Sequence, residues 1–116
     1  MSMIDRLYST YIMTNCNNVV FYIGVSGSLV SRVWKHKKRI YSNFFTARYN
    51  LNKLVWYENF DNPRDAIVCE KRLKSWRRDW KIDLVKKENS EFVDLSYDWY
   101  EVDGFEREGD SESSSE

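Results

Sequence analysis

Three short runs of apolar, β-branched and aromatic residues, at residues 10–14, 19–25 and 53–60, predict β-strands. The first two runs are separated only by the turn-forming asparagines and cysteine of residues 15–18. Two β-rich runs joined by such a turn predict an antiparallel hairpin. The chain is therefore expected to begin with a hairpin and to add a third strand later.

Apolar residues recur at helical spacing in two longer segments, which predict helices at residues 29–40 and 63–76. Ser28 is a candidate cap for the first helix. Asp61-Asn62-Pro63 places a cap residue before a proline at the first helical position of the second. A third helix, at residues 78–87, either continues the second or bends away from it. The aromatic residues of 90–100 are expected to pack back on these elements.

The formal net charge of zero conceals an uneven distribution of charge along the chain. Residues 1–100 contain 17 basic and 11 acidic side chains, whereas residues 101–116 contain seven acidic side chains and one basic one. We therefore expect one folded domain over residues 1–100, followed by a disordered acidic tail over residues 101–116. A basic body is typical of phosphate-binding proteins, although it does not by itself identify one. The tail either only solubilises the protein or competes with nucleic acid for the basic body.

The sequence argues against several classes of protein. It contains no apolar stretch long enough for a membrane span and no secretory signal pattern. Cys16, Cys69 and the single histidine, His36, lack zinc-ligand spacing, so free thiols in the cytoplasm are expected. No glycine-rich phosphate loop with a following lysine is present. Aromatic residues make up 16% of the chain, and each either belongs to the core or stacks on bases.

Glu70 is the most unusual residue of the helix predicted at residues 63–76. At 100° per residue it lies in the same arc as Ala66, Ile67 and Leu73. A carboxylate on a core-facing side is costly unless it is paired, protonated or bound to a metal. Glu70 is therefore either the partner of a buried arginine or a metal ligand or catalytic carboxylate.

Other polar residues are predicted to lie near one end of the hairpin. Tyr22 precedes Gly24, where a glycine permits close approach of a ligand, and Tyr11 lies on the paired strand. The helix that follows has a basic face made of Arg32, Lys35, His36 and Arg39. This face is either an ordinary solvated one or part of a pocket that it shares with both tyrosines and Glu70.

At this point a resemblance to a known family becomes specific. Tyr22-Ile23-Gly24 matches the second half of the GIY-YIG signature of an endonuclease superfamily. Tyr11 lies eleven residues earlier, at the place of the tyrosine in the first half. Arg32 and His36 follow in the order and spacing that the superfamily uses. The chain thus resembles a GIY-YIG endonuclease.

The resemblance extends over residues 8–99 and has two departures. Residues 66–74 look like the helix that carries the family's metal-binding glutamate. Residues 89–95 resemble the C-terminal segment of the small stand-alone bacterial branch, which is similar to the N-terminal domain of UvrC. The first half of the signature reads Ser9-Thr10-Tyr11, and Lys35 stands where many relatives have glutamate. Neither departure removes an expected catalytic group.

The resemblance implies an α+β fold with a three-stranded antiparallel sheet flanked by helices. Glu70 would hold Mg²⁺, or alternatively Mn²⁺, largely through water-rich coordination. Arg32 would clamp the scissile phosphate, and either Tyr11 or Tyr22 would take the proton of the attacking water. His36 would orient that tyrosine or relay its proton. The implied activity is endonucleolytic cleavage of DNA with low sequence specificity.

The expected substrate-binding residues lie around this site: Gly24, Lys35, Arg39, Arg48, Arg77 and Asn89. Arg78 and Lys81 would extend the basic surface, and Phe44, Phe45 and Tyr49 either stack on unpaired bases or fold into the core. The DNA would be single-stranded, duplex or branched, and RNA is an open alternative. Two other functions compete with cleavage, namely a non-catalytic nucleic-acid-binding module and an adaptor that uses the acidic tail. No membrane partner is expected, and the oligomeric state is open.

Overall fold

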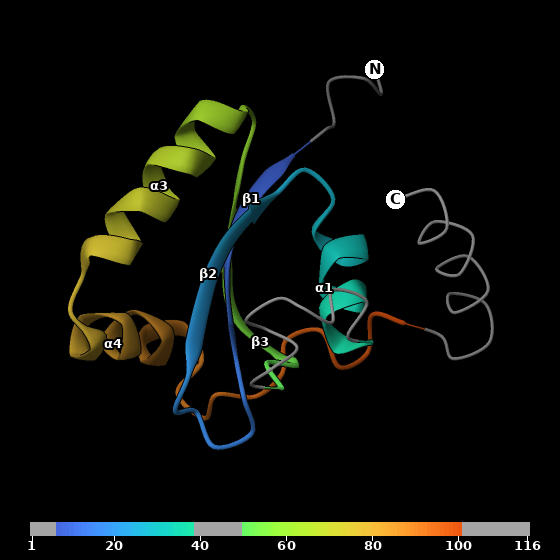
Figure 1. Ribbon diagram of the computed structural model, residues 1–116, viewed down its shortest axis with the longest axis vertical. Coiled ribbons are helices and arrows are strands. Elements are labelled where there is room, and N and C mark those ends of the chain that lie inside the picture. The colour runs from blue at the N-terminus through green and yellow to red at the C-terminus, as the bar shows by residue number, and fades with distance from the viewer. Residues whose placement is uncertain (1–6, 39–49, 101–116) are drawn as a thin grey trace.

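The sheet of this protein consists of three antiparallel strands, seen in a computed structural model that describes residues 7–38 and 50–100. They are β1 (Tyr8–Thr14), β2 (Phe21–Ser26) and β3 (Lys53–Phe60), in the order β2-β1-β3 (Figure 1). β1 and β2 form the expected hairpin, and β3 pairs with the other side of β1. The central position of β1 leaves β2 at an edge of the sheet.

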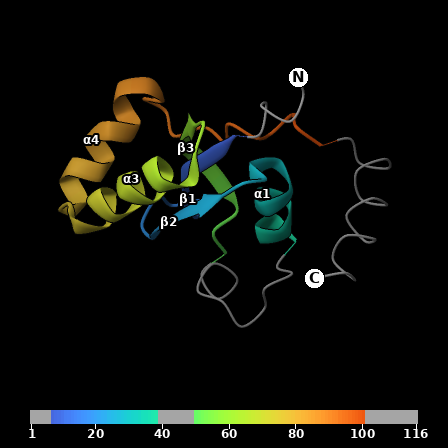
Figure 2. The same ribbon diagram turned by 90° about the horizontal axis from the view of Figure 1, so that it is seen from above.

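Helices cover both faces of the sheet. α3 (Pro63–Ser75) and α4 (Arg78–Glu88) lie on one side, and α1 (Leu29–Lys37) lies on the other (Figure 2). The α+β fold with a three-stranded antiparallel sheet and flanking helices is therefore confirmed. The described part of α1 is shorter than predicted, because it ends at Lys37.

Caps and breaks explain where α3 begins and ends. The Asn62 side chain accepts a hydrogen bond from the Asp65 backbone N–H at 2.9 Å, and Pro63 occupies the first turn. Trp76 and Arg77 then adopt extended backbone conformations, with ψ angles of 153° and 159°. The third predicted helix is therefore a separate one that bends away from the second.

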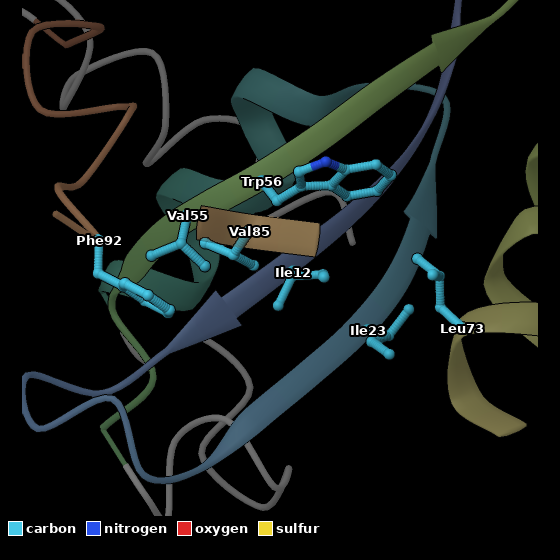
Figure 3. Close-up of a cluster of buried hydrophobic side chains, with 7 residues drawn as sticks. All are labelled: Ile12, Ile23, Val55, Trp56, Leu73, Val85 and Phe92. Carbon is cyan, nitrogen blue, oxygen red and sulfur yellow. The ribbon is translucent and has the colours of Figure 1, made fainter. Parts of the chain in front are cut away.

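Alternation along β1 divides its side chains between two cores. Ile12 packs towards α3 and α4, whereas Tyr11 and Met13 pack on the opposite face. The first core contains seven buried residues, namely Ile12, Ile23, Val55, Trp56, Leu73, Val85 and Phe92 (Figure 3). The second contains Tyr11, Met13, Val33, Leu51 and Leu54. β1 is thus buried on both faces, as expected for a central strand.

The buried hydroxyl groups of β1 all have partners. Thr10 Oγ donates to the Ala66 carbonyl of α3 at 2.7 Å, and Thr14 Oγ donates to the Val20 carbonyl at 2.7 Å. The first of these bonds ties α3 directly to the strand that carries Tyr11. Buried polar groups without partners would cost stability, so this bond fixes the position of α3.

Residues 90–100 pack back on the domain, as predicted. The Leu95 N–H donates to the Leu54 carbonyl at 2.7 Å. The Asp94 carboxylate accepts hydrogen bonds from Lys37 Nζ of α1 and from the Leu54 N–H of β3. Burial alone would raise the pKa of Asp94, but these bonds and those from Ser96 hold it below its usual range. The predicted tail, at 101–116, lies outside the described residues.

Candidate active site

Three aromatic rings meet on the face of the sheet that α1 covers. The Tyr11 hydroxyl lies 3.0 Å from His36 Nε2, so these two groups share a hydrogen bond. The Tyr22 ring lies 5.5 Å from the His36 ring, in an edge-on arrangement, and 6.1 Å from the Tyr11 ring. Strands β1 and β2 and helix α1 each contribute one ring. The structure thus brings together two tyrosines and the histidine that are distant in the sequence.

Gly24 allows this cluster to form. It pairs directly with Tyr11 in the hairpin register. A Cβ atom at Gly24 would lie 2.7 Å from Cζ and Oη of Tyr11 and 2.9 Å from Cε2 of Tyr22. These distances are too short for any substituent, so the close approach of the rings requires glycine. Residue 24 therefore acts by leaving space.

The environment of His36 keeps its ring neutral. The residue is 3% exposed, and burial, helped by the Arg32 charge, lowers its pKa from 6.5 to about 4. A neutral imidazole has one nitrogen with a lone pair, which can accept a proton or a hydrogen bond. His36 is therefore in a form that suits a role as acceptor towards Tyr11.

The basic face predicted for α1 is largely covered. Lys35 is only 2% exposed, contrary to its expected place on a solvated substrate-binding surface. Val33, Trp34, Lys35 and His36 are consecutive and all buried, so α1 is enclosed on most of its circumference. The C-terminal segment also contacts this helix, since the Tyr100 hydroxyl donates to the Val30 carbonyl at 2.8 Å. Burial raises the pKa of the Tyr100 hydroxyl, which keeps this donor protonated.

Glu70 lies on α3, and its surroundings differ in part from those predicted. Ala66 and Leu73 are buried beside it, but Ile67 is 40% exposed, so the expected apolar arc is narrower than the sequence suggested. The Glu70 side chain is 19% exposed, and its Oε2 lies 2.8 Å from Lys74 Nζ. This partner is one helical turn away and 55% exposed, in place of the buried arginine that was one alternative. Pairs of this kind contribute only about 0.3–0.5 kcal/mol, so a cation can displace the lysine.

The single carboxylate of Glu70 fits one kind of metal site. In the described parts of the chain, no group of three His, Cys, Asp or Glu side chains could enclose a metal ion. Mg²⁺ commonly uses one or two carboxylates, keeps several waters and takes its remaining ligands from substrate phosphates. A single, partly exposed carboxylate matches that pattern. Glu70 therefore fits a water-rich Mg²⁺ or Mn²⁺ site that the substrate completes.

A depression at the β2 edge is bordered both by Tyr22 and by the lysine that pairs with Glu70. Its volume is about 310 Å³, and it is lined by Phe21, Tyr22, Ile23, Lys74 and Lys81. Tyr22 belongs to the ring cluster, and Lys74 is the ion-pair partner of Glu70. Because β2 is an edge strand, groups from both faces of the sheet can border the same depression. The sequence analysis did not predict a role for Lys74, although its spacing of four residues from Glu70 indicates an ion pair on one helix face.

Comparisons with known proteins identify the family of this chain. Residues 7–83 match the family model of the GIY-YIG catalytic domain. The chain belongs to the GIY-YIG family. It is also similar to a UPF0213 protein of Pediococcus pentosaceus, with 29% identity over 85 residues that cover 73% of this chain and 88% of that protein. No solved structure matches the chain.

Membership of the GIY-YIG family points to nuclease chemistry on a nucleic acid with a divalent metal. The matched region includes both tyrosines of the ring cluster, His36 and Glu70. It ends before Asn89. No helix in the described ranges, 7–38 and 50–100, has the length and apolar character needed to cross a bilayer.

Asn89 has a structural environment. Its side chain is buried, and its Nδ2 donates to the carbonyls of Val55 and Val93 at 3.1 and 2.9 Å. Its Oδ1 accepts from the Val93 N–H at 3.0 Å. Both amide hydrogens are thus used within the protein, which leaves none for the phosphate contact expected from the sequence.

The remaining residues predicted to bind substrate lie in different parts of the protein. Arg77 is exposed at the corner between α3 and α4, where it forms a bidentate contact with Asp79 at 2.9 and 3.2 Å. Arg32 is partly buried on α1, near His36. Two predicted basic residues and three predicted aromatic ones lie outside the described residues: Arg39, Arg48, Phe44, Phe45 and Tyr49.

Proposed function

We propose that this protein is a metal-dependent endonuclease that hydrolyses phosphodiester bonds in DNA. The observation that carries the proposal is the depression at the β2 edge, which Tyr22 borders together with the lysine paired to Glu70. The depression offers a tyrosine and two lysines, and Glu70, the partner of one of these lysines, adds a carboxylate beside it. Phosphodiester hydrolysis needs groups of these kinds. Membership of the GIY-YIG family supports the same reaction class.

Tyr22 is the better candidate for the general base. Tyr11 has no exposed surface, whereas Tyr22 is partly exposed and lines the depression. Tyr22 can thus reach an attacking water, while Tyr11 can reach only groups inside the protein. We assign Tyr11 and His36 to positioning, because their hydrogen bond fixes the ring packed against Tyr22.

Glu70 would hold the metal, and Arg32 would bind the phosphate. A bound Mg²⁺ or Mn²⁺ would supply positive charge that stabilises the phosphate and the leaving oxygen. The planar guanidinium of Arg32 suits two-point contact with phosphate oxygens. Lys74, released from Glu70 on metal binding, would then be free to contact the nucleic-acid backbone at the same depression.

The test is a cleavage assay in Mg²⁺ with labelled single-stranded, duplex and branched DNA and with RNA of the same sequence. Glu70→Ala should abolish cleavage and leave binding largely intact. Glu91→Ala removes an exposed carboxylate outside the site and should cleave normally. Tyr22→Phe should reduce the rate about 100-fold or more, since it removes the proton acceptor but keeps the ring. Cleavage by Glu70→Ala at the wild-type rate would exclude this active site.

One observation favours a second function, which is binding without cleavage. Glu70 has an internal cationic partner, and no closed set of metal ligands surrounds it among the described residues. A binding module would show salt-sensitive affinity for DNA or RNA and no cleavage in either Mg²⁺ or Mn²⁺. The intact set of Tyr11, Tyr22, Arg32, His36 and Glu70 favours the nuclease.

A further inference from the structure

The corner between α3 and α4 combines exposed aromatic surface with a high density of basic charge. Residues 71–88 contain eight basic and three acidic side chains. Trp76 and Trp80 lie edge-to-face with their ring centroids 5.9 Å apart, and Trp80 is 48% exposed. The Arg77 guanidinium lies 5.3 Å from the centroid of the Trp80 ring. A large ring is thus held in place at the surface.

This corner also borders an open depression of its own. The depression has a volume of about 360 Å³ and is lined by Trp76, Trp80, Asp83, Leu84 and Lys87. Trp80 neighbours Lys81 in the chain, and Trp76 lies two residues after Lys74. Both lysines line the other depression, which Tyr22 borders. The aromatic corner and the candidate active site are therefore joined through α3 and α4.

We propose that the basic aromatic corner, made of Lys74, Trp76, Arg77, Trp80 and Lys81, binds a single-stranded segment of the nucleic acid beside the bond to be cut. One unpaired base would stack on the Trp80 ring, while Lys74 and Lys81 contact backbone phosphates. This inference rests on the proposed function and adds the class of substrate, which is DNA with unpaired bases next to the cleavage site.

The chemistry of the corner favours a single strand over a duplex. In a duplex the faces of the bases are already stacked on one another, so an exposed tryptophan gains little from them. Unpaired bases offer free π-faces, and stacking of each on an aromatic ring is a main source of affinity in single-strand binding proteins. The excess of positive charge selects a polyanion and makes binding depend on salt. Arg77 restricts the Trp80 ring and lowers the cost of ordering it.

The test measures binding alone, in Glu70→Ala protein so that the probes stay intact. The probes are a labelled oligothymidylate, an abasic strand of the same length and charge, and a duplex. Trp80→Ala should weaken oligothymidylate binding about 10-fold, the order expected for one stacked base, and should not change binding to the abasic strand. Trp80→Phe should retain most of the affinity. Tyr97→Ala, which removes a 78% exposed aromatic ring elsewhere, is the matched control and should have no effect.

Lys81→Ala should behave differently from the tryptophan variants. It should weaken binding of the oligothymidylate and the abasic strand alike and reduce the salt dependence by about one counterion. Equal losses on the abasic strand and oligothymidylate for Trp80→Ala, or an unchanged affinity for both, would refute stacking. Because these readouts need no cleavage, stacking can stand even if the nuclease test fails, and cleavage can stand if stacking fails.

Discussion

The buried side chain of His36 leads to a quantitative prediction of how the stability of the protein depends on pH. In the folded protein, burial and then the Arg32 charge lower the pKa of His36 to about 4, against 6.5 for the free side chain. As the pH falls from 7, the unfolded chain therefore binds a proton at this position before the folded protein does. The folded state is then progressively destabilised between pH 6.5 and pH 4, and the effect levels off below that range.

The magnitude follows from the two pKa values. Between pH 7 and pH 5, the difference in proton binding at His36 should lower the free energy of unfolding by about 2 kcal/mol. That is a large fraction of the roughly 5–15 kcal/mol by which domains of this size are stable. Acidic side chains titrate over part of the same pH range, so the pH dependence of the wild type alone does not give the contribution of His36.

The assay is urea unfolding followed by tryptophan fluorescence at pH 7, 6 and 5, for the wild type and for His36→Gln. Glutamine retains a hydrogen-bonding group near Tyr11 but has no proton to gain in this range. The stability advantage of the wild type over the variant should shrink by about 2 kcal/mol from pH 7 to pH 5. A pH-independent difference between the two proteins would show that His36 titrates normally in the folded state. An NMR titration of the single imidazole offers a direct check, with no protonation expected above about pH 5.

Three further substitutions test how the site is held. Gly24→Ala should displace the Tyr11 ring, because its Cβ would lie 2.7 Å from that ring, and should cost about 1–3 kcal/mol in thermal unfolding together with most of the cleavage activity. Asn89→Ala removes a buried hydrogen bond to the Val55 carbonyl and two part-buried ones to the Val93 backbone, so chemical denaturation should show a loss of about 1–3 kcal/mol, while the folded fraction binds DNA normally. Thr10→Val removes the bond to the Ala66 carbonyl and should cost about 1–2 kcal/mol; an unchanged unfolding midpoint would show that this bond does not hold α3.

The strands and helices were predictable because local patterns determine them. The hairpin follows from the asparagine turn, and the start of α3 follows from Asn62 and Pro63, whose cap and proline roles need no tertiary contact. The sequence left open whether α3 and α4 are one helix. Backbone conformation at Trp76 and Arg77 decides it, and no residue there forbids a helix.

The burial of α1 was the main feature that the sequence could not predict. Lys35 has helical spacing typical of a solvated basic face, yet the structure buries it. The C-terminal segment, more than fifty residues away in the sequence, contacts other residues of the same helix: Asp94 pairs with Lys37, and the Tyr100 hydroxyl donates to the Val30 carbonyl. The spacing of apolar residues indicates which face of a helix packs against the core. It does not show whether other parts of the protein cover a second face of the same helix. In the same way, Asn89 has the polarity of a surface residue, and only the tertiary structure shows both of its donors in use.

The short Tyr22-Ile23-Gly24 motif shows how little sequence is needed to specify one half of the site. Because side chains alternate along a strand, Tyr22 and Gly24 face the ring cluster while Ile23 enters the opposite core. The motif therefore fixes the register of β2 as well as its chemistry, since a shift by one residue would exchange these faces. Glu70 lies on the other side of the sheet, and the motif says nothing about it. Because β2 lies at the edge of the sheet, Tyr22 and Lys74, the ion-pair partner of Glu70, border one depression. A further strand added beyond β2 would separate Glu70 from Tyr22 without changing any residue of the site.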